Sequence, residues 1–169
     1  MKEMMCCSNC AHNKAQVKID NYRFEECGLD YVVLKGIEIV ECPKCGNIDP
    51  IIPRPVEIMR ILAQGVISKK SRLSGKEVRF LRNYLQMTGA QFARFLHTDK
   101  NTLAKQETGK TKIGPKTDLL IRLLALQLGE GLQADAHSAV LRFPDISERK
   151  DTGRQLLEVV PETQQCVYV

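Results

Sequence analysis

Several features that would assign this chain to a common class are missing from its sequence. It has no tryptophan, and aromatic residues make up only 5% of its 169 residues. No apolar run approaches the roughly 20 residues that a membrane-spanning helix requires. The N-terminus, Met-Lys-Glu-Met-Met, lacks the apolar core of a secretion signal. We therefore expect a cytoplasmic protein that has no membrane partner.

Sequence motifs for catalysis are also missing. No nucleophile lies near a base in a recognisable arrangement, and no glycine-rich loop of the kind that holds phosphate is present. The histidines, His12, His97 and His137, are too scattered to complete a site with cysteines, and an ordinary surface or packing role explains each of them better. We therefore do not expect an enzyme.

Cysteine, in contrast, is plentiful, with seven residues. The reducing cytoplasm disfavours disulfides, so we expect a metal site or redox-active thiols. Cys7 with Cys10 and Cys42 with Cys45 form two C-x-x-C pairs, the spacing at which two thiolates of one turn bind the same tetrahedral zinc ion. Four soft ligands also suit zinc better than magnesium or calcium. The sequence thus predicts one structural Zn²⁺ bound by these four residues.

Alternatives to this ligand set remain open in the sequence. The interval between the two pairs is 31 residues, longer than the roughly 15 to 20 of the usual zinc ribbon. Cys6 could replace Cys7, although its spacing to Cys10 is less regular. A redox dithiol is the rival of zinc, but it requires a strand-to-helix setting that neither pair shows. Cys27 and Cys166 are interpreted as buried or free thiols.

The interval between the cysteine pairs predicts β structure. It contains three short β-prone runs, at residues 22–24, 31–34 and 37–40. A small antiparallel sheet of these strands could bring the cysteine pairs together. Because so small a module buries little apolar surface, we expect the zinc ion to supply folding free energy rather than catalysis. Pro53 and Pro55 then end a predicted zinc-binding β domain of residues 1–55.

Positive charge is concentrated in the middle of the chain. Residues 56–129 contain 14 Lys and Arg against five Asp and Glu, a net charge of +9, whereas residues 1–55 and 130–169 carry −1 and −3. A concentrated basic segment is expected of a phosphate-binding surface. A run of charged residues alone is more often a solvated face. The basic segment therefore indicates phosphate binding only in combination with the helix pattern of the same residues.

The same segment contains the start signals of consecutive helices. Ser74 with Glu77, and Thr88 with Gln91, match the capping box that begins a helix, and a third start follows at residues 98–99. We expect helices over about 75–86, 89–97 and 99–108, and a fourth from Pro115 to about residue 128. This spacing is typical of a helix-turn-helix, whose second helix places its N-terminal residues against base edges in the DNA major groove.

The start of the third predicted helix holds the candidate DNA-binding residues. We expect Leu103 to face inward with Ala104 beside it. The outward residues are then Lys100, Asn101, Thr102 and Lys105. Asn can pair with adenine and Lys can reach guanine acceptors, so Asn101 and Lys105 are the predicted base-reading residues. The alternative for Asn101 is an exposed polar residue or a helix-start hydrogen bond.

Phosphate contacts are expected from the neighbouring basic residues. Lys110 follows the third helix, where a phosphate contact is more plausible than a base contact. On the first helix, Lys76, Arg79 and Arg82 lie largely away from the apolar stripe, so we expect a basic face that is free to meet phosphates.

The remaining segments are a connector and an extension. Residues 56–73 predict a short helix over 56–63, followed by a polar hinge over 65–74 that contains Lys69, Lys70 and Arg72. The fourth helix is apolar on more than one face, which favours either core packing or a two-fold dimer contact.

In the extension, 130–169, we expect a polar stretch that is partly disordered through residue 154. Two strands could follow, over 156–160 and 166–169. Their edges either invite a partner or pack onto the helical module.

The order of these motifs resembles the MqsA family of bacterial antitoxins and regulators, which join a YgiT-type zinc finger to a Cro-type helix-turn-helix. The resemblance rests on the two C-x-x-C pairs followed by segments 74–82 and 107–110, and it covers roughly residues 5–129. It implies a structural zinc, an N-terminal module that can bind an RNA-cleaving toxin, and a C-terminal module that dimerises and represses its own operon. By this resemblance Asn101 matches a base-contacting Asn and Lys105 a base-contacting Arg. Lys lacks the bidentate fork of Arg, so we expect a different preferred operator.

These patterns predict an α+β protein in which a small zinc-bound antiparallel β module precedes an all-α helix-turn-helix domain. The predicted parts are residues 1–55, 56–73, 74–129 and 130–169. The predicted function is a homodimeric repressor that binds double-stranded operator DNA and represses its own operon. One alternative is an antitoxin that acts mainly by neutralising a ribonuclease toxin, and another is a Cys-x-x-Cys redox protein.

Overall fold

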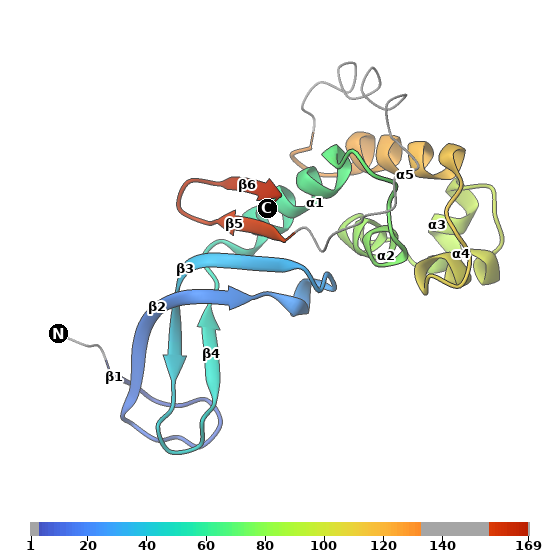
Figure 1. The fold of residues 1–169 in the computed structure, drawn as a ribbon. Helices are drawn as coiled ribbons and strands as arrows, with labels where there is room; N and C mark the ends of the chain where they lie inside the picture. The colour runs from blue at the N-terminus through green and yellow to red at the C-terminus, as the bar shows by residue number, and fades with distance from the viewer. Residues whose placement is uncertain (1–3, 133–155, 169) are drawn as a thin grey trace.

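The computed structural model describes residues 4–132 and 156–168 and has the predicted α+β class (Figure 1). The strands are β1 (Met4–Met5), β2 (Ala15–Arg23), β3 (Val32–Glu41), β4 (Ile48–Ile51), β5 (Leu157–Val160) and β6 (Gln165–Tyr168). The helices are α1 (Pro55–Ser68), α2 (Gly75–Tyr84), α3 (Gly89–Phe95), α4 (Lys100–Glu107) and α5 (Pro115–Leu128), with a short 3-10 turn at Glu25–Cys27. The polar stretch expected through residue 154 lies largely outside the described residues.

Strand β3 organises a sheet with the order β1-β2-β3-β5-β6, in which β4 also pairs with β3. One edge of β3 is covered by β2. The other edge is divided: β5 pairs with Val32–Leu34 in parallel, and β4 pairs with Glu38–Glu41 in antiparallel orientation. The antiparallel pairing expected of the N-terminal strands is confirmed for β1 to β4. The C-terminal hairpin adds a parallel pairing that the sequence did not predict.

The two C-terminal strands are confirmed, and they form the antiparallel hairpin β5–β6. The hairpin packs against α1 as well as extending the sheet. Lys35 on β3 and Glu158 on β5 form an ion pair of 2.8 Å between neighbouring strands. Residues almost at the end of the sequence thus complete a sheet that begins near its start.

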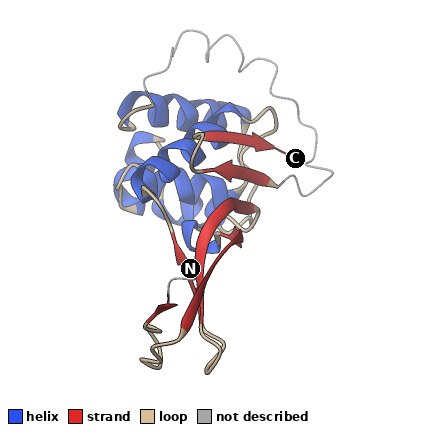
Figure 2. Cartoon of the chain, turned by 90° about the vertical axis from the view of Figure 1, so that its left-hand side faces the viewer, coloured by secondary structure: helices blue, strands red, loops and turns tan. Residues whose placement is uncertain are grey.

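Strands β2, β3 and β4 extend away from the helices as an arm (Figures 1 and 2). The pairing of β2 with β3 changes register between Asp20 and Tyr22, and Gly36 on β3 has a φ of +65°. A register shift and a left-handed glycine both bend a strand pair. One strand pair can therefore contribute to the core at one end and carry the two C-x-x-C turns at the other.

The core lies between the helices and the near end of the sheet. Its fully buried members include Val32, Leu34, Leu157 and Val159 from the sheet and Leu62, Leu81, Phe92 and Ile121 from the helices. A second, much smaller cluster lies at the far end of the arm: Cys7, Ala15, Val40 and Cys42. The apolar surface of the sheet is thus buried mainly against helices, and the end of the arm has little apolar packing of its own.

The polar hinge expected over residues 65–74 is not present. Helix α1 begins at Pro55 and continues to Ser68, well beyond the expected end at residue 63. Lys69, which follows it, is 9% exposed, and Leu73 is 4% exposed. The charged residues of this segment predicted a solvated hinge, but Lys69 is buried against an acidic partner.

Arg122 of α5 fixes the backbone that follows α1. Its side chain is fully buried, and its Nε donates to Asp118 Oδ2 over 2.7 Å. Its guanidinium also donates to the carbonyls of Ile67, Lys69 and Ser71. Asp118 accepts from the backbone N–H of Leu73 over 2.6 Å. This ion pair satisfies backbone groups that would otherwise be buried without partners.

Glu77 of α2 forms the second buried charge centre. Its carboxylate accepts from Lys69 Nζ over 3.0 Å and from the Tyr31 hydroxyl over 2.5 Å. It also accepts from the backbone N–H of Ser74 over 2.6 Å, which completes the capping box. Burial and the neighbouring Glu77 carboxylate both raise the pKa of Tyr31, so this hydroxyl stays protonated and donates. One carboxylate therefore joins the sheet, the connector and the start of α2.

We predict that Arg122→Met destabilises the protein by about 3 to 5 kcal/mol, because the Asp118 carboxylate would stay buried without its cation. Urea unfolding of the zinc-loaded chain measures this free energy. Arg79→Met in α2 is the matched control, since Arg79 is exposed, and a change within about 0.5 kcal/mol is expected. Similar losses in the two variants would contradict the structural role of Arg122.

Candidate metal centre and nucleic-acid interface

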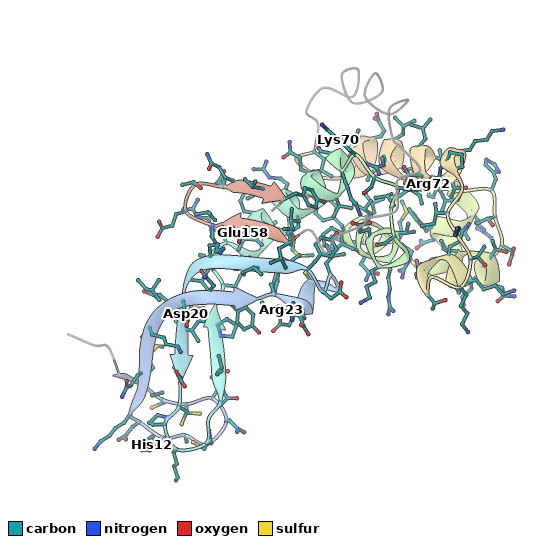
Figure 3. All side chains as sticks on the ribbon, viewed as in Figure 1. His12, Asp20, Arg23, Lys70, Arg72 and Glu158 are labelled. Carbon is teal, nitrogen blue, oxygen red and sulfur yellow. The ribbon has the colours of Figure 1, made fainter. Side chains whose placement is uncertain are left out.

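The two C-x-x-C pairs meet at the far end of the arm. The ligand atoms of Cys7, Cys10, Cys42 and Cys45 all lie within 4.8 Å of one another. Figure 3 shows sulfur atoms gathered in this region, near the labelled His12. The cysteines belong to the tip of the arm, which consists of residues 6–12 and 42–47.

The two turns of the tip have the same backbone geometry. In each turn the first cysteine N–H donates to the carbonyl five residues later, from Cys7 to His12 and from Cys42 to Asn47, both over 2.9 Å. The residue after each second cysteine is left-handed: Ala11 has a φ of 54° and Gly46 a φ of 70°. Glycine at this position marks the second turn in the sequence, whereas the alanine of the first turn gives no such signal.

The sulfur geometry fits one tetrahedral ion. Cys7 Sγ lies 3.6 Å from Cys45 Sγ, and Cys10 Sγ lies 3.6 Å from Cys42 Sγ. A tetrahedral site with Zn–S bonds of about 2.3 Å separates its sulfur atoms by about 3.8 Å. A disulfide needs sulfur atoms about 2.05 Å apart. The four cysteines are therefore close enough to bind one metal ion, and a zinc ion is consistent with their number and type.

The pKa values of two thiols are moved in opposite directions. The hydrogen bond from the backbone of His12 lowers the pKa of Cys10, but burial and the three neighbouring thiols raise it to about 12. Burial raises the pKa of Cys42, but backbone hydrogen bonds from Cys45 and Lys44 lower it to about 7. Neighbouring thiols thus favour ionisation of Cys42 and oppose ionisation of Cys10. A bound cation would offset the opposition at Cys10.

Polar contacts also join the two turns outside the sulfur cluster. Ser8 Oγ donates to Asp49 Oδ2 over 2.7 Å and accepts from Asn47 Nδ2 over 3.2 Å. The Asn9 side-chain amide lies 3.8 Å from Cys45 Sγ and can donate to it. A donor beside a thiolate stabilises its negative charge, so these residues form an outer shell of the candidate site.

The other cysteines lie apart from this cluster. Cys6 is exposed and Cys7 is buried within the cluster, so Cys7 is the candidate ligand of the two. Cys27 is half-buried and donates to the Phe24 carbonyl over 2.9 Å. Desolvation by burial raises the pKa of Cys27 to about 11, as expected for a packed thiol. The side chain of Cys166 lies outside the described residues.

Helices α2, α3 and α4 begin where the capping signals predicted. The Ser74–Glu77 and Thr88–Gln91 boxes both form. Asp99 caps α4, and both of its carboxylate oxygens accept from Thr102. The Thr102 hydroxyl and backbone N–H hold the pKa of Asp99 below its ordinary value.

Two of these helices end earlier than expected, because the chain turns through left-handed residues. Gln86 has a φ of 55° and His97 a φ of 50°. After each, a backbone hydrogen bond closes the helix end: Met87 N–H donates to Arg82 and Thr98 N–H donates to Ala93. Glycine is the usual residue at such a position. Because neither position is glycine, the sequence did not predict where these two helices end.

Arg82 ties α2 to the end of α4. Its guanidinium makes a bidentate contact with Glu107, with Nε–Oε1 at 2.6 Å and Nη2–Oε2 at 3.2 Å, and donates to the Met87 carbonyl. Lys76 pairs with Asp30 over 2.7 Å. The expected free basic face on α2 is therefore wrong for two of its three members, because only Arg79 is exposed without a described ion pair.

The start of α2 lies directly against the end of α4. A Cβ atom on Gly75 would lie 2.3 Å from the Gln106 carbonyl oxygen and 2.6 Å from that of Glu107. Only glycine fits at this approach. Together with the Arg82–Glu107 pair, this contact fixes the orientation of α4 relative to α2.

The candidate DNA-binding residues occupy one side of α4 and the turn after it. Lys100, Asn101, Lys105 and Lys110 are all exposed, as expected. Thr102 is half-buried, and its hydroxyl donates to Asp99 Oδ2 over 2.5 Å, so it serves the helix start rather than an open surface.

The inward side of α4 differs from the expectation. Leu103 is buried, with 1% of its side chain exposed, but its buried companion is Gln106 rather than Ala104. Ala104 is exposed on the outward side. Residues 103 and 106 are three positions apart, so they lie on the same face of the helix. Because Gln106 is polar, the sequence pattern did not predict that it is buried.

No described helix has the length and apolar character needed to cross a membrane. Comparisons with protein-family models, curated proteins and solved structures gave no match for this chain.

We predict that the purified protein binds one Zn²⁺ per chain and that Cys42→Ser abolishes this stoichiometry. Zinc content, measured by elemental analysis after dialysis, tests this, and cobalt substitution reports tetrahedral thiolate ligation. Cys6→Ser is the matched control, because Cys6 is exposed outside the cluster, and it should retain one ion. Equal zinc content in the two variants would contradict the ligand assignment.

We predict opposite effects from exchanging alanine and glycine in the two turns. Gly46→Ala should destabilise the tip by about 1 kcal/mol, since its left-handed backbone resists a Cβ although the surrounding space is open. Ala11→Gly should stabilise it by a few tenths to about 1 kcal/mol. Zinc retention against increasing chelator measures both effects. Ala90→Gly in helix α3 is the control for adding glycine, and it should leave zinc retention unchanged.

Proposed function

We propose that this chain is a sequence-specific DNA-binding transcriptional regulator of the MqsA type, in which α3 and α4 form the helix-turn-helix and the zinc is structural. The resemblance in motif order supports the family assignment. The proposal depends on the outward face of α4 more than on any other feature.

The outward face of α4 has the composition expected of a DNA-reading surface. Lys100, Asn101, Ala104, Lys105 and Thr108 are exposed and fall within one continuous arc of the helix. No acidic side chain lies in this arc, because Glu107 is turned toward Arg82. Lysine and asparagine can both contact base edges or phosphates. This uninterrupted arc is the observation that carries the proposal.

The start of α4 also suits an approach to DNA. The Asp99 carboxylate accepts hydrogen bonds from Thr102 and so caps the helix. Helix-turn-helix proteins place the N-terminal residues of this helix against bases. Lys100 and Asn101 are the first two residues of α4, so they would meet base edges first, with Lys105 one turn later.

Exposed basic residues beside this face would contact phosphates. Lys110, Lys112 and Lys116 follow α4, and Arg94 lies on the preceding helix; all four are exposed. Such contacts would position the protein without reading sequence. They also make binding depend on salt, since each neutralised phosphate releases counterions.

The metal centre supports a structural rather than a catalytic role. All four candidate ligands are cysteines, whereas catalytic zinc sites generally keep one position for water or substrate. The bound ion would supply folding free energy to the tip, whose own apolar cluster is small. The proposal therefore assigns no enzyme activity to the chain.

A homodimer would allow two copies of α4 to meet successive major grooves. Helix α5 leaves Leu119 37% exposed and Leu128 45% exposed, with Leu123 half-buried between them. Leu119 and Leu123 lie one turn apart on the same side of α5, whereas Leu128 lies on the opposite side. A second copy could cover Leu119 and Leu123, and two-fold dimers suit paired half-sites about 34 Å apart. Sedimentation equilibrium tests this: a monomer at the concentrations that bind DNA would remove the dimer from the proposal.

Antitoxin activity is the second candidate function. Ile19 on β2, Glu38 on β3 and Ile51 on β4 lie in register across the arm. The two isoleucines are 75% and 39% exposed. Exposed apolar residues on a projecting arm favour a protein partner. A small basic ribonuclease-like protein that co-purifies with the chain would favour this function; its absence would leave DNA binding alone.

We predict that the protein binds DNA upstream of its own coding sequence and that Asn101→Ala reduces the specific affinity by about 10-fold or more, since a bidentate base contact is worth about 1 to 3 kcal/mol. Fluorescence anisotropy at several salt concentrations measures specific and non-specific binding. The salt-sensitive, non-specific component should survive in the variant.

The matched control is Asn83→Ala, because Asn83 is an exposed asparagine on α2, and it should bind as the wild type does. Binding no tighter than to random DNA would contradict self-repression. Equal losses in the two variants would contradict base reading by Asn101.

A further inference from the structure

Ala104 is the one apolar side chain on the outward arc of α4. Leu103 and Gln106 are buried on the opposite side of the helix. Lys100 lies one turn before Ala104, and Thr108 lies one turn after it. The Thr108 hydroxyl donates to the Ala104 carbonyl over 2.9 Å, so this hydroxyl is already hydrogen-bonded to the end of the helix. A single methyl group is therefore displayed among long, positively charged side chains.

A methyl group in this position has one natural complement in the major groove. Thymine is the base that presents a methyl group there, and alanine contacts that methyl group in base recognition. Lysine and asparagine recognise hydrogen-bonding atoms instead, so they cannot substitute for this contact. The apolar area is small, but it would be removed from water on both partners.

Ala104 and Asn101 are close enough to read neighbouring base pairs. They are separated by three residues, which corresponds to about 4.5 Å along the helix axis. Successive bases of one DNA strand are about 3.4 Å apart. If Asn101 pairs with adenine, Ala104 would meet the base pair next to it. We propose that Ala104 is a specificity-determining residue that recognises a thymine methyl group beside the base pair read by Asn101.

This assignment rests on the proposed function, because it requires α4 to enter the major groove. Its test begins by selecting a binding site for the zinc-loaded full chain from randomised duplex DNA. Each thymine of the selected site is then replaced by deoxyuridine, which lacks only the methyl group. Asn101→Ala is used to locate the neighbouring base pair, as the position at which base preference relaxes.

We expect wild-type protein to lose about fourfold in affinity at one thymine next to that position, the factor that corresponds to burial of one methyl group. Ala104→Gly should bind the thymine and deoxyuridine sites equally. Ala90→Gly, which removes the same methyl group from a neighbouring helix, should keep the fourfold discrimination. Ala104→Ser gives a second variant with a side chain, and it should also lose the discrimination.

The possible failures are distinct. A selected site without thymine beside the Asn101 position, or wild-type protein that binds deoxyuridine as tightly, would overturn the role of Ala104 while leaving DNA binding intact. Discrimination that persists in Ala104→Gly or Ala104→Ser would overturn it as well. The deoxyuridine comparison needs only wild-type protein, so it stands even if a variant fails to fold. A selection that enriches no sequence would overturn the proposed function itself.

Discussion

The arrangement of α1, α2 and α5 depends on the charges that are buried around the segment joining α1 to α2. Glu77 is fully buried and would be strongly destabilising without partners. Lys69, Tyr31 and the start of α2 supply them. Arg122 and Asp118 supply hydrogen-bond partners to the backbone of residues 67–73. Apolar packing alone would allow helices to slide, whereas these directional contacts select one arrangement.

These contacts form a continuous connection from the sheet to the proposed reading helix. Tyr31, next to β3, binds Glu77 at the start of α2, and Arg82 near the end of α2 binds Glu107 at the end of α4. The close approach at Gly75 reinforces the second contact. The outward face of α4 is consequently held by packed and ion-paired neighbours, which is the preorganisation that sequence reading needs. The arm shares strands β2 and β3 with this framework, while its tip depends on the cysteine cluster.

Local sequence signals predicted the elements that local chemistry controls. The capping boxes at Ser74 and Thr88 gave the starts of α2 and α3, and Pro115 gave the start of α5. The C-x-x-C spacing identified four cysteines that the fold brings together. Each of these signals lies within a few residues of the feature it specifies, so it survives without knowledge of the tertiary structure.

Several of the expectations that failed depend on contacts outside the local sequence pattern. Lys69 was expected to be solvated, but its partner Glu77 lies in the next helix. Arg82 was expected to be free, and its partner Glu107 is 25 residues away. The parallel pairing of β3 with β5 joins residues more than a hundred positions apart. No local pattern marks such contacts, and the buried Gln106 shows that polarity alone does not give the face of a helix.

The central claim is that the outward face of α4, and not the arm, meets nucleic acid. Chemical modification of lysines, measured by mass spectrometry with and without duplex DNA, tests it directly because exposed lysines mark both regions. The account predicts that DNA protects Lys100, Lys105 and Lys110, while Lys14 and Lys44 of the arm react at unchanged rates. Protection of the arm lysines with continued reactivity on α4 would contradict it.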